Sequence, residues 1–580
     1  MIVGLATAGA YGYQQWQKLG VAADVTEFAP ADAEAILWIP RVDEFTQALL
    51  TFSRGIQEAE RLRELLKPET GVDLGDSDGL RAVGVDPEAG LVVFTRKDMP
   101  HVLFGVEDAE TFTEALRAKF VNMGHPAAVV TEGSDGLIMN TIPGEGGHHA
   151  AFAAHEGLLV LVYRTGDQDP EAAVRLVLAG PKQAFFASEQ YKEVQQKLGD
   201  DGLMIWASGD RFARHGDGAP NVTLLDSLKL HPLLDGMFRA RYADWLTQVS
   251  WAGARMSVAA CAADLRATVH VAKPLELFPP GWLLSSDVPA PDLGKLLPRD
   301  TVLYTRFGLD VTGPAKLMTQ ISNLTGGLGK LGDIFGLEQK PAQDPVAALL
   351  SKYVHPQLSD RHVVRDVLDH LTGHVGVAFA GVDRKARPQE LIDIKNPRRW
   401  LGRTIQLIVV LQLKQAAQVL DKWWPKRQIL GELGFDVEKL KVENAAHTVL
   451  RLQRNCGKNV RARIVNKKRV FPPCETYGLL LSEDLLYLTT GPNTLDRLYE
   501  TVSGNAASLH GLTREKLAIG VLEHAPMTLG SYFSFDGLLK AIRHLNLPGG
   551  ATRYLAQMYE LVMTLDTQGG DLTGRVLLTR

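Results

Sequence analysis

The strongest constraint on the fold is an order of apolar segments that occurs twice along the chain. The segment PADAEAILWIPRVDEFTQALL begins at Pro30, and PRDTVLYTRFGLDVTGPAKLM begins at Pro298. Both contain a proline, one residue, an aspartate, a short apolar stretch with an aromatic residue, a second aspartate and an amphipathic stretch. Because alternation with period 2 indicates a strand and a period of 3.6 indicates a helix, each segment is predicted to form a strand followed by a helix.

The segments that follow keep the same order in both halves. GLVVFTRKDMPHVLFGVEDAETFTEALRAKF from Gly90 corresponds to GHVGVAFAGVD from Gly373 together with TIQLIVVLQLKQAAQVLDKWW from Thr404. AAFAAHEGLLVLVYRTGDQDPEAAVRLVL from Ala150 corresponds to YGLLLSEDLLYLTTGPNTLDRLYETV from Tyr477. Each of these is predicted to form two strands and a helix. ADLRATVHVAK in the middle of the chain also resembles GDLTGRVLLTR at its end.

These patterns predict an α+β fold made of two tandem copies of an antiparallel-sheet unit, built from strand–strand–helix modules with helices on one face of each sheet. Tight turns at His155–Gly157 and Ser482–Asp484 indicate antiparallel hairpins. Over 580 residues, we expect an apolar start at 1–25, a first repeat at 26–275, a linker at 276–297 and a second repeat at 298–580. The alternative is that an α+β chain of this length shows such modules by chance.

The apolar start, MIVGLATAGAYGY, carries no charge before Lys18 and is followed by Trp16. It is shorter than the roughly 20 apolar residues that span a bilayer. A basic segment before it is missing, so we expect a truncated signal anchor that attaches the protein to the membrane. A cleaved signal peptide and a buried first helix or strand stay open as alternatives.

Composition excludes several classes of protein. Hydrophobic residues make up 45% of the chain and charged residues 22%, which argues against a disordered, fibrous or polytopic membrane protein. The net charge of −5 provides no overall basic surface, so we expect no nucleic acid as a partner.

The sequence has three cysteines, and no two of them form a C-x-x-C pair. The cysteine spacing therefore does not support a zinc site or a thioredoxin-like redox site. Cys456 and Cys474 flank one strand-like stretch, so a hairpin could join them in a disulfide in an oxidising compartment. Two unrelated cysteines are the alternative. Cys261 lies in an apolar run and is expected to be a buried strand residue.

The second half carries a basic segment. Residues 385–469 contain 20 Lys and Arg against 7 Asp and Glu, and part of this excess lies in an insertion at 384–403. Arg398, Arg399 and Arg403 are therefore candidates for contact with an anionic surface such as lipid headgroups. A solvated basic face without a partner is the other interpretation.

Several patterns look chemical, but their contexts do not support catalysis or metal binding. Gly75–Gly79 matches G-x-S-x-G yet follows a loop-like stretch, whereas a nucleophile elbow needs a strand before it. The stretch Thr325–Leu331 lacks the hydroxyl residue that a phosphate loop carries after its lysine. Two histidine groups lack zinc-site spacing: His148, His149 and His155, and His362, His370 and His374. We expect no enzyme activity, no cofactor and no metal.

The duplicated pattern behind an apolar start resembles the uncharacterised, membrane-anchored bacterial proteins of the domain-of-unknown-function type, which carry a large extracytoplasmic α+β region. The residues that carry the resemblance are Pro30, Asp32, Trp38 and Asp43, and Pro298, Asp300, Tyr304 and Asp310. The resemblance implies no activity and no functional residue.

The function predicted from the sequence is a non-enzymatic role in the periplasm or another extracytoplasmic space, anchored at the inner membrane. The protein would bind a partner there, such as an envelope protein, a lipid or an anionic surface. A carrier or chaperone for an apolar ligand is the first alternative, since a sheet covered by helices can hold a lipid. A hydrolase whose site the sequence does not reveal is the second.

Overall fold

The computed structural model describes residues 24–53, 77–134, 136–144, 147–213, 245–271, 293–308, 370–383, 402–416, 418–419, 428–432, 434–440, 447–456, 463–465, 468–470, 474–509, 529–542, 560–568 and 571–579. The chain forms two compact units, Met1–Lys273 (unit 1) and Pro274–Arg580 (unit 2). Three predicted features lie largely or wholly outside the described residues: the apolar start, the linker and most of the insertion at 384–403.

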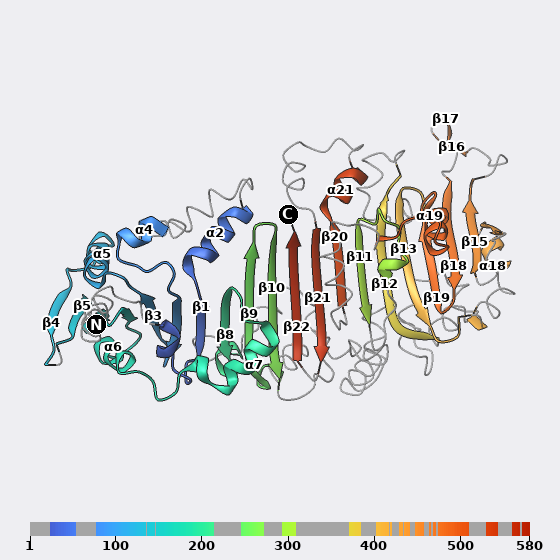
Figure 1. The fold of residues 1–580 in the computed structure, drawn as a ribbon. Helices are drawn as coiled ribbons and strands as arrows, with labels where there is room; N and C mark the ends of the chain where they lie inside the picture. The colour runs from blue at the N-terminus through green and yellow to red at the C-terminus, as the bar shows by residue number, and fades with distance from the viewer. Residues whose placement is uncertain are drawn as a thin grey trace, which may run out of the picture. The chain divides into compact units, whose positions relative to one another are not determined.

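Unit 1 contains an antiparallel sheet (Figure 1). Its described strands lie in the order β4-β5-β6-β7-β3-β2-β1-β8-β9-β10. Their bounds are β1 Ala35–Ile39, β2 Leu91–Arg96, β3 Met99–Gly105, β4 Val129–Glu132, β5 Ile138–Gly144, β6 Gly147–His155, β7 Leu158–Tyr163, β8 Leu203–Ser208, β9 Val249–Ala259 and β10 Ala262–Val271. The helices are η1 Val25–Phe28, α2 Val42–Ser53, α4 Ser77–Ala82, α5 Ala109–Asn122, α6 Pro170–Leu178, η2 Phe185–Ala187, α7 Glu189–Leu198 and α8 Gly209–Ala213.

Helices cover both faces of the unit 1 sheet, so the prediction of helices on one face is wrong. On one face, α6, η2 and α7 pack against alternate strand residues such as Leu158 and Val160 of β7. On the other face, α5 packs against Leu159 and Leu161 of the same strand. Because successive strand residues point to opposite faces, β7 is buried on both sides.

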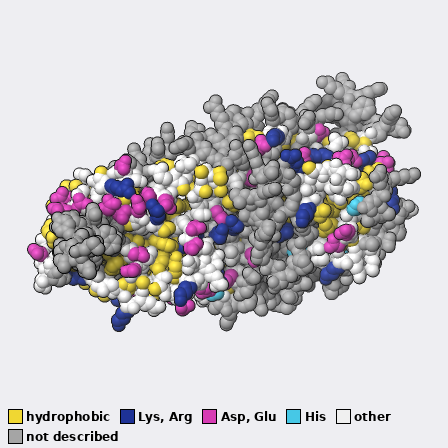
Figure 2. All heavy atoms as spheres, viewed as in Figure 1, with side chains coloured by type: hydrophobic (Ala, Val, Ile, Leu, Met, Phe, Trp, Pro, Cys, Tyr) yellow, Lys and Arg dark blue, Asp and Glu magenta, His cyan; other side chains and the backbone are white. Residues whose placement is uncertain are grey.

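The helices of unit 1 begin at residues suited to capping free backbone N–H groups. The carboxylate of Asp108 accepts hydrogen bonds from the N–H groups of Glu110 and Thr111 at the start of α5. A hydrogen bond from the Thr111 hydroxyl, together with those from the two N–H groups, lowers the pKa of Asp108. Asp169 caps α6, which has a proline in its first turn, and Ser188 caps α7. Acidic and basic side chains are intermixed over the visible surface of the unit (Figure 2).

Unit 2 also contains an antiparallel sheet, in the order β14-β15-β18-β19-β13-β12-β11-β20-β21-β22. The strand bounds are β11 Leu303–Gly308, β12 Leu371–Val382, β13 Ile405–Leu413, β14 Asp436–Lys439, β15 His447–Arg454, β18 Glu475–Ser482, β19 Leu485–Thr490, β20 Leu529–Ser534, β21 Glu560–Gln568 and β22 Asp571–Thr579. A separate pair joins β16 Arg463–Val465 to β17 Lys468–Val470. The helices are η4 Leu293–Lys295, α18 Gln428–Glu432, α19 Thr494–Val502 and α21 Phe535–Ile542.

The sheet strands of the two units have the same connectivity. The strand β1 corresponds to β11, and the strands β2 and β3 correspond to β12 and β13. The four strands β4–β7 correspond to β14, β15, β18 and β19, and the three strands β8–β10 correspond to β20–β22. With these correspondences the two strand orders coincide. The segment pairs that match in sequence occupy corresponding places in the two orders.

Smaller contacts also correspond. Pro30 forms an isolated bridge with Ala184, and Pro298 forms one with Ser508. The aspartate two residues after each proline is also ion-paired, but the partners lie on elements that do not correspond: Arg96 of β2 pairs with Asp32, and Arg497 of α19 pairs with Asp300.

Candidate functional site

The structure places one of the three candidate arginines. Arg403 precedes β13, and its guanidinium pairs with the carboxylate of Glu475 at 2.7 Å, with both side chains largely buried. Its charge is therefore neutralised within unit 2 by a carboxylate on β18. Arg398 and Arg399 lie outside the described residues, and their contact with an anionic surface stays a prediction.

Cys456 and Cys474 form a disulfide, with Cα atoms 4.5 Å apart. The bond joins the end of β15 to the residue before β18, and these strands are neighbours in the sheet. Disulfides persist in oxidising compartments, so this bond favours an extracytoplasmic location. Every helix in the described part of the chain is too short or too polar to span a bilayer.

Cys261 is exposed in the turn between β9 and β10. The prediction that it is a buried strand residue is therefore wrong. The apolar run around it continues through a hairpin turn, where strand pairing ends and side chains reach solvent.

Some residues of the sequence motifs that do not support catalysis or metal binding lie in the described part of the chain. Ser77 of the G-x-S-x-G pattern begins α4, and the two residues before it lie outside the described range. His149 of β6 stacks on His125, with ring centroids 4.6 Å apart. Partial burial and the nearby His125 lower the pKa of His149. Sequence spacing did not indicate this pair, because 24 positions separate the two residues.

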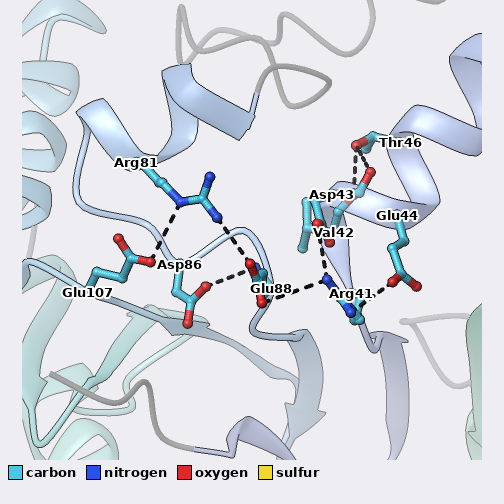
Figure 3. Close-up of polar contacts among 9 residues, drawn as sticks. All are labelled: Arg41, Val42, Asp43, Glu44, Thr46, Arg81, Asp86, Glu88 and Glu107. Carbon is cyan, nitrogen blue, oxygen red and sulfur yellow. Dashed lines mark hydrogen bonds and ion pairs between the residues drawn. The ribbon is translucent and has the colours of Figure 1, made fainter. Parts of the chain in front are cut away.

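A network of ion pairs lies on unit 1 (Figure 3). Arg41 pairs with Asp43 and Glu44 near the start of α2 and reaches Glu88, which also pairs with Arg81 of α4. Arg81 in turn contacts Glu107. These side chains are mostly exposed, and exposed pairs contribute little individually. The network connects α2 and α4 to the loops beside them, and its carboxylates already have cationic partners.

The outer strand β4 has the most unusual surface in the described part of unit 1. All four of its side chains are exposed, including Val129 at 48% and Val130 at 50%. Because these neighbours point to opposite faces, a valine reaches solvent on each side. Among the described strands, β4 pairs only with β5, so one row of its backbone N–H and C=O groups faces outward.

More exposed apolar side chains lie close to β4 in the sequence. Of eleven large hydrophobic residues that are exposed in the described structure, five lie between positions 121 and 138: Val121, Met123, Val129, Val130 and Ile138. Val121 and Met123 are at the end of α5, and Ile138 pairs with Glu132 across the β4–β5 hairpin. We call β4 together with these three residues the β4 edge.

Local structure fixes how the chain enters the β4 edge. The helix α5 ends at Asn122 and is followed by Gly124, whose φ of +88° is accessible to glycine at little cost. The N–H of Gly124 donates to the carbonyl of Val121, and the N–H of His125 donates to the carbonyl of Phe120. On the inner side, the guanidinium of Arg117 donates to the side-chain oxygen of Asn140 in β5 at 2.7 Å.

The corresponding outer strand of unit 2 is protected. The strand β14 reads Asp-Val-Glu-Lys, and Glu438 pairs with Arg451 of β15 at 3.7 Å. Charged residues on an edge strand hinder pairing with another chain, because such pairing would bury the charges. The β4 edge carries one charge on its strand, Glu132, and is therefore less protected.

No family model and no curated protein matches the chain. Among solved structures, crystal form III of TP0453 matches distantly, with a TM-score of 0.25 and 7% identity, over 43% of this chain and 80% of that chain. Crystal form I has a TM-score of 0.24 and 7% identity over 44% and 81% of the two chains. Crystal form IV has a TM-score of 0.24 and 8% identity over 45% and 82%. Similarity at this level does not establish a shared function.

Proposed function

We propose that the protein is a non-enzymatic, extracytoplasmic binding protein that adds an extended segment of a partner protein to its β4 edge. The observation that carries this proposal is the exposed apolar surface of β4, beside the charged surface of β14 at the corresponding place in unit 2. In strand addition, backbone hydrogen bonds supply affinity and alternate side chains supply specificity. The partner segment would therefore have apolar residues at alternate positions.

The test uses the full chain and a set of eight-residue peptides with valine or isoleucine at alternate positions, alongside proline-containing versions of the same composition. We expect the alternating peptides to bind and to slow amide hydrogen exchange at residues 129–132. Val130→Lys should weaken binding at least tenfold, because a charge on the edge must be desolvated. The matched control is Val437→Lys in β14, which should leave binding unchanged. Equal binding by the Val130→Lys protein would contradict the proposal.

We also infer that the two units arose by tandem duplication of one α+β unit. The shared strand order, the paired bridges at Pro30 and Pro298 and the matching sequence segments support this origin. Experimental structures showing different strand orders in the two sheets would contradict it. On this proposal, the copies have diverged in function, since β4 presents an apolar edge where the corresponding described strand, β14, is charged.

Attachment to the inner membrane through residues 1–25 remains part of the proposal. The Cys456–Cys474 disulfide supports an oxidising environment for unit 2. Fractionation of cells expressing the chain with and without residues 1–20 tests the attachment. Loss of the membrane-bound fraction on deletion is the expected result, and an unchanged distribution would argue against an anchor.

A further inference from the structure

The strand β9 of unit 1 contains a buried arginine without a carboxylate partner among the described residues. Arg255 is 2% exposed, and neither its Nε nor its Nη1 has a hydrogen-bond acceptor in the described structure. Its Nη2 contacts the sulfur of Met204 at 3.4 Å, which is a weak acceptor. Since a guanidinium stays charged, burial without an anion is costly, and an added anion at this place would be strongly favoured.

The guanidinium lies within an aromatic group. Trp38, Met204 and Arg255 occupy one row across β1, β8 and β9. The guanidinium carbon is 5.4 Å from the Trp38 ring, which packs edge-on against Phe186 at 4.9 Å. Trp38 and Phe186 are only partly buried. Figure 2 shows hydrophobic side chains at the surface of unit 1 between the places of α6 and α7 in Figure 1.

Unpartnered donors gather on this face of the sheet. The indole Nε1 atoms of Trp38, Trp206 and Trp251 are buried without a hydrogen-bond partner among the described residues, as are Nε and Nη1 of Arg255. Trp38, Trp206 and Trp251 all pack with the cluster under η2 and α7. A set of N–H donors without acceptors favours a ligand that brings several acceptor oxygens.

The neighbouring charges do not neutralise Arg255. Directly across the β9–β10 pair lies a second arginine, Arg266. The carboxylate of Asp264 bonds to Arg266 at 3.2 Å. Arg266 and Asp264 therefore neutralise one another, and Arg266 offers Arg255 no acceptor.

The same strand order occurs in unit 2 without an arginine at the position that corresponds to Arg255. Counted from Pro30 and Pro298, the corresponding row in unit 2 consists of Arg306, Gly530 and Thr564, so a threonine occupies the place of Arg255 and an arginine occupies the place of Trp38. A sheet with the same strand order therefore forms with a neutral residue at this position. In unit 1 the arginine on β9 is buried, and its Nε and Nη1 atoms have no acceptor in the described structure, which points to a ligand.

We propose that unit 1 binds an anionic amphiphile at this face, with the oxygens of the acidic headgroup on Arg255 and the Nε1 of Trp38. The apolar chain lies along Trp38 and Phe186, which are both only partly buried. Carboxylate and phosphate headgroups share the required chemistry, because each presents at least two acceptor oxygens to the guanidinium fork. The site is separate from the β4 edge, so it goes beyond the proposed function.

The experiment measures binding to the full chain by calorimetry and tryptophan fluorescence, below the critical micelle concentration of each probe. Dodecanoate and dodecyl phosphate are the anionic probes, with dodecanol and dodecyltrimethylammonium as controls. We expect saturable binding of one anionic molecule and no saturable binding of the controls. Preference for one anionic probe identifies the headgroup. Inorganic phosphate that competes as strongly as dodecyl phosphate would overturn the amphiphile assignment.

Arg255→Met provides the decisive variant, because methionine keeps an apolar volume at the site. It should weaken binding roughly tenfold to hundredfold, the effect of losing charge-assisted hydrogen bonds. Without ligand its Tm should equal or exceed that of the parent, since a buried charge is removed, and this shows that the variant folds. Arg266→Met is the matched control on β10 and should keep most of the affinity. Unchanged affinity in Arg255→Met, or equal binding of dodecanol, would overturn the proposal.

Discussion

His101 of β3 is a buried imidazole in an apolar setting. It is 2% exposed, stacks on Phe94 with ring centroids 4.5 Å apart, and contacts the carbonyl of Met99 through Nδ1 at 2.9 Å. Burial lowers its pKa to about 4. Below the ordinary value near 6.5, the unfolded chain therefore takes up a proton that the folded protein does not accept until about pH 4.

We predict that acid destabilises unit 1 through this residue. As the pH falls from about 6.5 to about 4, up to about 3 kcal/mol of stability should be lost. Denaturant unfolding at pH 7 and pH 4.5 measures the loss, and His101→Phe should reduce it. A pH dependence that persists unchanged in His101→Phe would show that other groups control the acid response.

Glu560 of β21 has the opposite effect on how the stability of the protein depends on pH. It is 5% exposed, its carboxylate accepts a hydrogen bond from Tyr532 at 3.4 Å, and burial raises its pKa to about 7. The folded state then holds a proton that the unfolded chain loses above about pH 4.5. The stability that this bound proton contributes is therefore fully present below pH 4.5 and is lost as the pH rises to about 7.

Glu560→Gln should stabilise unit 2 at alkaline pH, since the amide keeps the shape without the charge. At pH 8 the expected gain is up to about 3 kcal/mol, and near pH 4.5 it should be close to zero. Urea titrations at the two pH values give both numbers. A gain of equal size at both pH values would assign the effect to packing instead of charge.

Among the elements, the disulfide makes a prediction for unit 2. The bond closes a loop with a sequence separation of 18 residues between β15 and β18. Loop-closure entropy assigns such a crosslink about 3 kcal/mol. Reduction should therefore lower the unfolding free energy of unit 2 by up to that amount and leave unit 1 unchanged. The double variant Cys456→Ser/Cys474→Ser should match the reduced protein, and no change in denaturant midpoint would show that the bond contributes little.

The elements also show what the sequence could predict. Paired strands and hairpin turns follow local patterns, so the sequence predicts the turns at Glu156 and Glu483, and both residues have positive φ. The covering of both faces differs from the prediction. The unbroken apolar run of β7, Leu-Leu-Val-Leu-Val-Tyr, is the sequence pattern that indicates a strand buried on both faces. Whether Val129 is exposed depends on which strand ends the sheet, and no local pattern encodes that order. Whether Arg255 has an anionic partner depends in the same way on which residues of β8 and β10 lie beside it in the sheet.

At the scale of the whole molecule, His101 and Glu560 predict that pH decides which unit opens first. At pH 4.5 the β2–β3 region of unit 1 should lose amide protection before β20–β21 of unit 2, and at pH 8 the order should reverse. Hydrogen exchange with mass spectrometry measures both regions in one sample. The same opening order at both pH values would contradict the prediction, and His101→Phe with Glu560→Gln should remove the reversal.

The central position of β1 and β11 has a consequence for biosynthesis. Ala35 of β1 pairs with Ala207 of β8, and Leu303 of β11 pairs with Phe533 of β20. The first described strand of each unit therefore lacks one of its neighbours until the ribosome has synthesised a strand much later in that unit. At about 5–20 residues per second, the wait is roughly ten to fifty seconds. Throughout that interval an apolar strand edge is open to wrong partners, so we expect the nascent chain to depend on a holding chaperone until each sheet can close.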